Sequence, residues 1–178
     1  VAEYPKNVVM PVELIDGSLG HSKVVGFLAY AMADSLNLPE TEKKDILKAG
    51  YLFDIGKEII PHHILNRRGK VDGHEVFEIK KHPVETVLML KKMGYEDENL
   101  FEIIESHHEN FFGGGYPNGL KREEIPIGSR ILRVADVYDA LTSWRLYRES
   151  WDYRAAYSEI RKDRDSGKFD PEVVDCLG

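Results

Sequence analysis

The chain has 178 residues, enough for one domain with a hydrophobic core, and 42% hydrophobic with 31% charged residues is typical of a soluble globular protein. Its net charge of −7 argues against DNA as a partner, because binding to the phosphate backbone usually needs a basic surface. The single cysteine, Cys176, excludes an internal disulfide and favours a cytoplasmic location, and we find neither a membrane-spanning apolar run nor a signal-peptide pattern.

Apolar residues recur with helical spacing along most of the chain. The first such helix carries Val24, Val25 and Leu28 and is expected to end before Pro39. A second is expected over residues 41–53, although its start lacks the acidic residue of a capping box. Further helices are predicted over residues 74–93, with a kink or restart at Pro83, and over 98–108, 127–142 and 153–163.

Glycine-rich breaks lie at residues 113–115 and at Gly119, and no five-residue alternation predicts a strand. We therefore predict an all-α fold, a single compact helical bundle over residues 1–178. Because the sequence starts at Val1, we expect this domain to be part of a longer protein.

The helix expected over residues 127–142 contains a carboxylate, Asp136, with apolar residues on almost every side. A buried carboxylate without a partner costs several kcal/mol, and a metal ion or a cationic side chain removes that cost. A salt bridge to Arg130 or Arg133 is the simpler explanation when Asp136 is taken alone.

Other residues of metal-ligand type also lie on or beside apolar helices: His21, Asp54, His82, His107 and His108. Each by itself is more often a core or capping residue. If His107 and His108 both close a helix, their side chains point about 100° apart, which a shared or dinuclear site explains better than a core role. Imidazole and carboxylate ligands together suit Fe, Mn, Zn or Ni, and the ligand set does not choose among these metals.

The remaining histidines carry a weaker signal. His62 and His63 follow a proline in a turn-like segment, and His74 follows a glycine. Solvent-exposed side chains are the better interpretation for these three. The pair Arg67 and Arg68 is most simply an exposed loop.

Short motifs run through nearly the whole chain: His21-Ser22-Lys23-Val24, Phe53-Asp54-Ile55-Gly56-Lys57, Ile60-Pro61, His82-Pro83, His107-His108-Glu109, Gly115-Tyr116-Pro117-Asn118-Gly119-Leu120, Ile125-Pro126, residues 135–143, residues 145–148 and Phe169-Asp170-Pro171. In order and spacing these resemble the HD-GYP family, bacterial signalling domains that hydrolyse the second messenger cyclic di-GMP. The resemblance implies an all-helical domain in which Asp54 bridges two metal ions.

One metal would be held by His21, Asp136 and the histidine that the family has before Asp54. The other would be held by His82, His107 and His108. In such a site water activated by the metals attacks phosphorus, because metal binding lowers the pKa of water.

The resemblance also implies roles in catalysis and substrate binding. Asp54 and Lys57 would be catalytic, with Lys57 neutralising charge on the phosphate of cyclic di-GMP. Tyr116 would lie on the Gly-Tyr-Pro loop at the mouth of the pocket, where a partner signalling domain would dock. Arg145 and Arg148 would hold phosphate or guanine through their guanidinium groups. A homodimer is compatible with this interpretation.

Four positions depart from the family pattern. Phe53 replaces the histidine ligand, and Phe112 stands where an aspartate is usual. Gly17 stands where trinuclear members carry a glutamate, and Leu146 replaces a proline. Loss of a residue that merely orients a ligand costs roughly 10–100-fold in metal affinity or activity, so loss of a ligand itself should cost at least as much. We therefore predict one tightly bound metal and a weakened second site.

Three hypotheses follow. The first is a phosphodiesterase that opens cyclic di-GMP to linear pGpG, GMP or both, impaired by Phe53. The second is a catalytically inactive regulatory module that binds cyclic di-GMP or a protein. The third is a metal-holding interaction domain that does not meet the nucleotide. Phe53 and Phe112 favour the second hypothesis, whereas the retained ligands and Lys57 favour the first.

Overall fold

The computed structural model describes residues 3–67, 69–70, 72–143 and 150–178. In these residues we find helices and turns but no strand, which confirms the predicted all-α fold. The extent of the domain stays a prediction. The elements are α1 (Lys6–Asp16), α2 (His21–Ser35), α3 (Glu40–Leu52), η1 (Ile55–Ile59), α4 (His62–Leu65), α5 (Gly73–Ile79), α6 (His82–Lys92), α7 (Glu98–Glu105), η2 (Arg122–Glu124), α8 (Ile127–Thr142), α9 (Tyr153–Asp165) and α10 (Pro171–Asp175).

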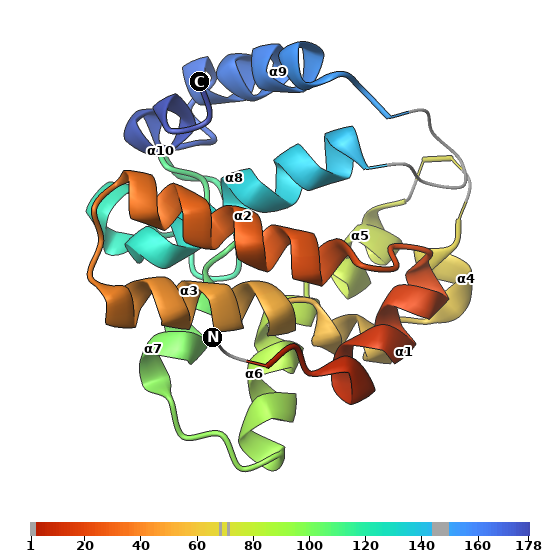
Figure 1. The fold of residues 1–178 in the computed structure, drawn as a ribbon. Helices are drawn as coiled ribbons and strands as arrows, with labels where there is room; N and C mark the ends of the chain where they lie inside the picture. The colour runs from red at the N-terminus through yellow and green to blue at the C-terminus, as the bar shows by residue number, and fades with distance from the viewer. Residues whose placement is uncertain (1–2, 68, 71, 144–149) are drawn as a thin grey trace.

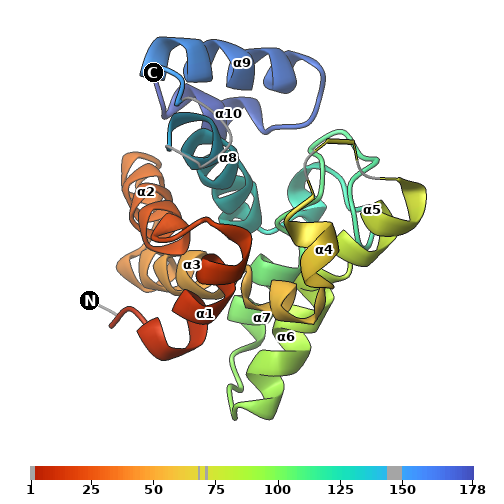
Figure 2. The same cartoon turned by 90° about the vertical axis from the view of Figure 1, so that its right-hand side faces the viewer.

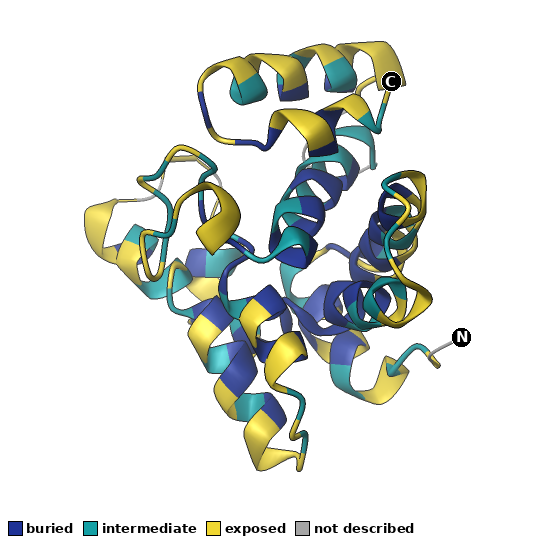
Figure 3. Ribbon diagram, turned by 90° about the vertical axis from the view of Figure 1, so that its left-hand side faces the viewer, coloured by how far each residue is buried: buried dark blue, intermediate teal, exposed yellow. Residues whose placement is uncertain are grey.

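The helices α2, α3 and α8 form the centre of the molecule. α2 and α3 lie side by side, and α8 packs against both of them (Figure 1). On one side α9 and α10 cover α8, while on the other α6 and α7 pack together below α3 (Figures 1 and 2). Figure 3 shows that buried residues gather on the faces where these helices meet. Among the described residues, no helix combines the length and hydrophobicity that crossing a bilayer requires.

Two glycines allow α2 and α3 to approach each other closely. A Cβ atom added to Gly50 would lie 2.5 Å from the Cα atom of Gly26, closer than real Cβ contacts come. Around this crossing Ala29, Ala33 and Ala49 are completely buried. The small residues therefore set the distance between the two helices that carry His21 and lead into Asp54.

We expect Gly50→Ala to destabilise the fold by about 1–3 kcal/mol, because the added methyl group forces the two helices apart. Urea unfolding monitored by circular dichroism measures this change. Gly73→Ala is the matched control, because its added Cβ meets nothing within 4 Å, and its stability should be unchanged or slightly higher. Equal stability of both variants would contradict the close crossing.

The stretch expected as one helix over residues 74–93 is two helices, α5 and α6. Pro83 lies in the first turn of α6, where a missing backbone N–H costs nothing, so the predicted restart is confirmed. The structure also contains elements that the sequence did not predict: α1, η1, α4, η2 and α10. α1 continues through Pro11 and is attached to the start of α2 by Glu13, whose buried carboxylate accepts the N–H groups of Gly20 and Ser22 at 2.8 Å.

The position of His107 and His108 differs from the expectation. α7 ends at Glu105, so both histidines lie in the turn after the helix and not on its last turn. The side chain of His107 donates through Nδ1 to the carbonyl of Ile104 at 2.5 Å, which fixes the ring against the end of α7. The argument from helical geometry was therefore wrong for this pair, and their orientation comes from the turn.

Candidate active site

A close packing of η1 on α6 brings Asp54 to His82. A Cβ atom added to Gly56 would lie 2.5 Å from the backbone nitrogen of Thr86, so only glycine fits here. The Thr86 hydroxyl accepts the N–H of Gly56 at 2.9 Å and donates to the carbonyl of Phe53 at 3.0 Å. As a result Asp54 Oδ1 lies 3.4 Å from His82 Nε2.

Three imidazole rings converge beside Asp54. The potential ligand atoms of His82, His107 and His108 all lie within 4.8 Å of one another. His82 Nε2 is 3.4 Å from His107 Nε2 and 3.1 Å from His108 Nε2. We refer to these three residues as the histidine cluster.

The hydrogen bonds of the cluster leave two nitrogens without protons facing each other. His82 Nδ1 donates to the carbonyl of Ile79 at 2.7 Å, and His107 Nδ1 donates to that of Ile104 at 2.5 Å. In the neutral rings both Nε2 atoms therefore present lone pairs. Two lone pairs 3.4 Å apart repel each other unless a cation lies between them. This donor set therefore fits a metal ion.

Burial keeps the rings of the histidine cluster neutral. It lowers the pKa of His107 to about 4, and the proximity of His82, which disfavours a second proton in the cluster, acts in the same direction. Burial also lowers the pKa of His82 and carries that of His108 well below the usual value for histidine. Metal binding requires the neutral form of imidazole, so near pH 7 no proton has to be removed from a charged ring.

Asp54 shares its two oxygens between the histidine cluster and a lysine. Lys57 Nζ lies 2.5 Å from Asp54 Oδ2 and 3.7 Å from Asp16 Oδ2. Burial by itself would lower the pKa of Lys57, but the carboxylates of Asp54 and Asp16 outweigh it and raise that pKa. Burial likewise opposes ionisation of Asp54, yet Lys57 and His82 hold its pKa below the usual value. The site therefore holds a charged lysine beside a charged carboxylate.

The other half of the site is paired internally. His21 Nε2 lies 3.1 Å from Asp136 Oδ1, and His21 Nδ1 lies 2.5 Å from Asp139 Oδ2. Burial would lower the pKa of His21, but hydrogen bonds to Asp136 and Asp139 raise it to about 9. The sequence interpretation missed Asp139, although its position three residues after Asp136 puts both on one face of α8. It also missed that Asp136 pairs with a histidine, whereas Arg130 pairs with Asp170 at 2.7 Å.

Phe53 separates the two halves. Its ring is 1% exposed and meets His21 and His107 edge-on, with ring centroids 5.8 Å and 5.1 Å apart. A phenyl ring offers no lone pair, and both nitrogens of His21 already face carboxylates. The donors His21, Asp54 and Asp136 therefore fit a second metal poorly, while the histidine cluster with Asp54 fits one.

The Gly-Tyr-Pro loop lies over the histidine cluster. The ring of Tyr116 stacks on His108 at a centroid distance of 4.8 Å, and burial raises the pKa of Tyr116 to about 12. Glu109, buried at the base of this loop, accepts the N–H groups of Asn118 at 2.7 Å and Gly119 at 2.9 Å. Glu109 therefore orients the loop, a role that its place in the sequence motif did not reveal.

The other positions singled out in the sequence fall into two groups. Phe112 is exposed and packs against Gly167 and Arg122, and Gly17 ends α1 with a φ of 74°. The predicted substrate contacts Arg145 and Arg148, with Leu146 between them, lie outside the described residues.

The weaker histidines behave as predicted. His62, His63 and His74 are all exposed, which confirms that they belong to the surface. Arg67 is also exposed, and its guanidinium pairs with Glu75. Arg68 lies outside the described residues.

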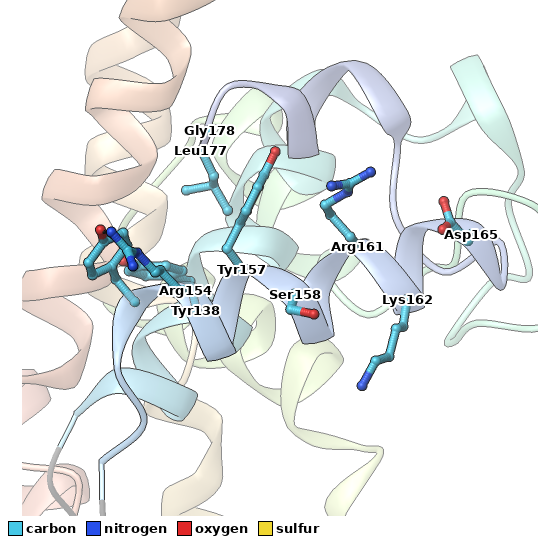
Figure 4. Close-up of a pocket in the computed structure, with 10 residues that line it drawn as sticks. Tyr138, Arg154, Tyr157, Ser158, Arg161, Lys162, Asp165, Leu177 and Gly178 are labelled. Atoms are coloured by element: carbon cyan, nitrogen blue, oxygen red, sulfur yellow. Dashed lines mark hydrogen bonds between the residues drawn. The ribbon is translucent and has the colours of Figure 1, made fainter.

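A separate cavity of about 460 Å³ lies beside α9, lined by Tyr138, Tyr157, Arg161 and the C-terminal Leu177 among other residues. Figure 4 shows Tyr157 and Arg161 on one side of α9 and Lys162 on the other. The cavity shares no lining residue with the histidine cluster and Asp54. It is therefore a different surface from the candidate active site.

The chain is similar in sequence to known proteins of one family. The model of the family described as HD domain matches residues 14–173. The chain is 38% identical over 153 residues to a cyclic di-GMP phosphodiesterase of Pseudomonas aeruginosa, covering 86% of this chain and 36% of that protein. It is also 38% identical over 159 residues to the cyclic di-GMP phosphodiesterase response regulator RpfG of Xanthomonas campestris, covering 84% and 40%. The 3'3'-cGAMP-specific phosphodiesterase 2 of Vibrio cholerae is 34% identical over 158 residues, covering 88% and 30%.

Solved structures agree on the fold. The structure of Bd1817, an HDG"Y"P protein of Bdellovibrio bacteriovorus, superposes with a TM-score of 0.72 at 20% identity, over 96% of this chain and 58% of that one. The chain spans less than half the length of the curated relatives named above. With the match across nearly all of its residues, the chain belongs to the HD domain family, and its resemblance to the HD-GYP phosphodiesterases is confirmed.

Proposed function

We propose that this chain is the phosphodiesterase part of a bacterial signalling protein that hydrolyses cyclic di-GMP to linear pGpG, GMP or both, at a rate lowered by Phe53. The observation that carries the proposal is the meeting of the histidine cluster with Asp54, whose second oxygen faces Lys57. Relatives named as cyclic di-GMP or 3'3'-cGAMP phosphodiesterases support the substrate class.

In this proposal Asp54, His82, His107 and His108 hold one divalent ion, chosen from Fe, Mn, Zn or Ni. When bound, the ion supplies positive charge near the scissile phosphate and makes water more acidic. The Nε2 lone pairs of His82 and His107 face each other, and the burial of these two rings excludes competing solvent. The ligand set therefore supports a metal-dependent hydrolase without selecting the metal.

Lys57 is the cation that the substrate phosphate would meet next to Asp54. Its ammonium group is held by Asp54 and Asp16, while its side chain keeps 22% of its surface exposed. A fixed cation at this place can stabilise the charge that develops on the phosphate oxygens as the bond breaks. Tyr116 would border the bound nucleotide, and Arg145 and Arg148 stay predicted contacts to phosphate or guanine.

A second candidate function is a regulatory module that binds cyclic di-GMP without turning it over. The observation that favours it is Phe53, which fills one half of the site with an apolar ring between His21 and His107. The two functions differ in one measurable respect, since both predict binding and only the first predicts a hydrolysed product.

Slow, metal-dependent hydrolysis is the expected result when the chain, loaded with Mn²⁺ or Fe²⁺, is incubated with cyclic di-GMP and the products are separated by chromatography. Removal of the metal with a chelator should abolish product formation, and adding the metal back should restore it, because imidazole and carboxylate ligands bind a metal ion reversibly. Binding without any pGpG or GMP would support the regulatory module. Absence of binding would favour a metal-holding domain with another partner.

A further inference from the structure

Arg133 on α8 is a cation beside the histidine cluster that forms no ion pair with any acidic side chain of the described residues. It lies three residues before Asp136, so both side chains leave the same face of the helix. The guanidinium of Arg133 hydrogen-bonds to Nδ1 of His108, and its Nε atom is buried without a hydrogen-bond partner. Among the described residues, no carboxylate lies within salt-bridge distance of it.

The two other arginines that are partly buried among the described residues form ion pairs with carboxylates. Arg130, one turn earlier on α8, donates to Asp170 at 2.7 Å and to the carbonyl of Ile125 at 3.0 Å. Arg164 on α9 contacts Asp165 and Asp175, both at 2.9 Å. A partly buried guanidinium without a counter-ion is unfavourable by itself. The unpaired guanidinium of Arg133 therefore points to an anionic ligand that binds beside it.

The location of Arg133 fits the phosphate of a ligand. The guanidinium of Arg133 contacts Nδ1 of His108, and the ring of Tyr116 stacks on the same histidine, so this cation lies at the part of the site that the Gly-Tyr-Pro loop covers. One terminal nitrogen of the guanidinium lies against His108 Nδ1, while Nε has no hydrogen-bond partner. A guanidinium offers several donors in one plane, which suits the oxygens of a phosphodiester.

We propose that Arg133 is a substrate-binding residue that pairs with a non-bridging phosphate oxygen of the cyclic dinucleotide, beside His108. This inference rests on the proposed function for the identity of the ligand. The pairing of Arg133 with a phosphate is independent of the proposed function, because any phosphate that enters the site would meet the same guanidinium.

The test measures binding of inorganic phosphate and of cyclic di-GMP by calorimetry, on metal-loaded protein with metal content determined in each sample. Arg133→Ala removes a charge-assisted pair, so its affinity for both ligands is expected to fall about 10–100-fold. Arg133→Lys should recover part of the loss, because it restores the charge without the planar fork. Arg161→Ala, an arginine of the separate cavity beside α9, is the matched control and should bind both ligands like the parent.

The outcomes separate this inference from the proposed function. Unchanged affinity for both ligands in Arg133→Ala would remove Arg133 from the substrate site and leave the phosphodiesterase proposal standing. If phosphate binding depends on Arg133 but the chain does not bind cyclic di-GMP, the role of Arg133 is supported and the proposal that cyclic di-GMP is the ligand is contradicted. A higher metal content in Arg133→Ala with unchanged ligand affinities would show that Arg133 acts on the metal site, and would overturn the inference.

Discussion

Phe53→His is expected to raise the metal content from about one ion to two per chain and to speed the hydrolysis of cyclic di-GMP by about 100-fold or more. The ring of Phe53 lies between His21 and His107, so an imidazole at this place would supply the missing donor next to Asp54. Elemental analysis of the purified protein measures the first effect, and the rate of pGpG formation measures the second.

The Phe53→His substitution is also expected to lower the stability of the metal-free protein. Phe53 is 1% exposed, and a polar ring in a buried place lowers stability when no metal binds it. Added metal should therefore raise the melting temperature of Phe53→His more than that of the parent. Phe101→His, at a buried phenylalanine of α7, is the matched control and should be destabilised without gaining metal.

Two bound metals without turnover in Phe53→His would show that Phe53 is not what limits hydrolysis. Phe112→Asp is not expected to be needed, because Phe112 packs on the surface against Gly167 and Arg122. If the double variant Phe53→His/Phe112→Asp also takes up two metals and forms no product, the result favours the regulatory module over the phosphodiesterase.

His107→Ala is expected to remove nearly all bound metal and with it all hydrolysis. His107 is completely buried, and its Nε2 lone pair lies opposite that of His82. A side chain at the surface therefore cannot take the place of the lost imidazole as a ligand. Elemental analysis after purification gives the metal content. His63→Ala is the control, because His63 is exposed and its removal should leave the content unchanged.

Since the alanine variant leaves a cavity, folding must be checked by circular dichroism. His107→Gln keeps most of the volume while replacing the imidazole, and it should be folded and still poor in metal. A metal content equal to that of the parent in folded His107→Gln would show that the metal binds away from the histidine cluster.

Much of the fold follows from the sequence because helix formation is a local property. The apolar spacing of 127–142 predicted α8 with both of its ends, and Pro83 predicted the restart of α6. Helix α1 was missed, since Pro11 interrupts the pattern and Glu13, which faces the core, looks like a surface residue. Its place becomes clear only when Glu13 meets the first backbone N–H groups of α2.

The residue types of the site were also visible in the sequence, and the resemblance to the HD-GYP family pointed to Phe53 as the place where a ligand is missing. What the sequence could not determine is which atoms face each other. His21 and Asp139 are 118 positions apart, and their contact exists only because α2 and α8 pack together. In the same way the sequence suggested Arg133 as a partner for Asp136, whereas packing places it against His108.

The sequence by itself therefore determined the all-α fold, most of the longer helices and the residue types that the site contains, because these depend on local spacing and on residue identity. The tertiary structure alone decided that the lone pairs of His82 and His107 converge, that His21 is held between Asp136 and Asp139, and that Arg133 lacks a carboxylate partner among the described residues. The physical reason is that each of these contacts joins groups from different helices or turns, whose distances are set by close packing at places such as the glycine crossing of α2 and α3.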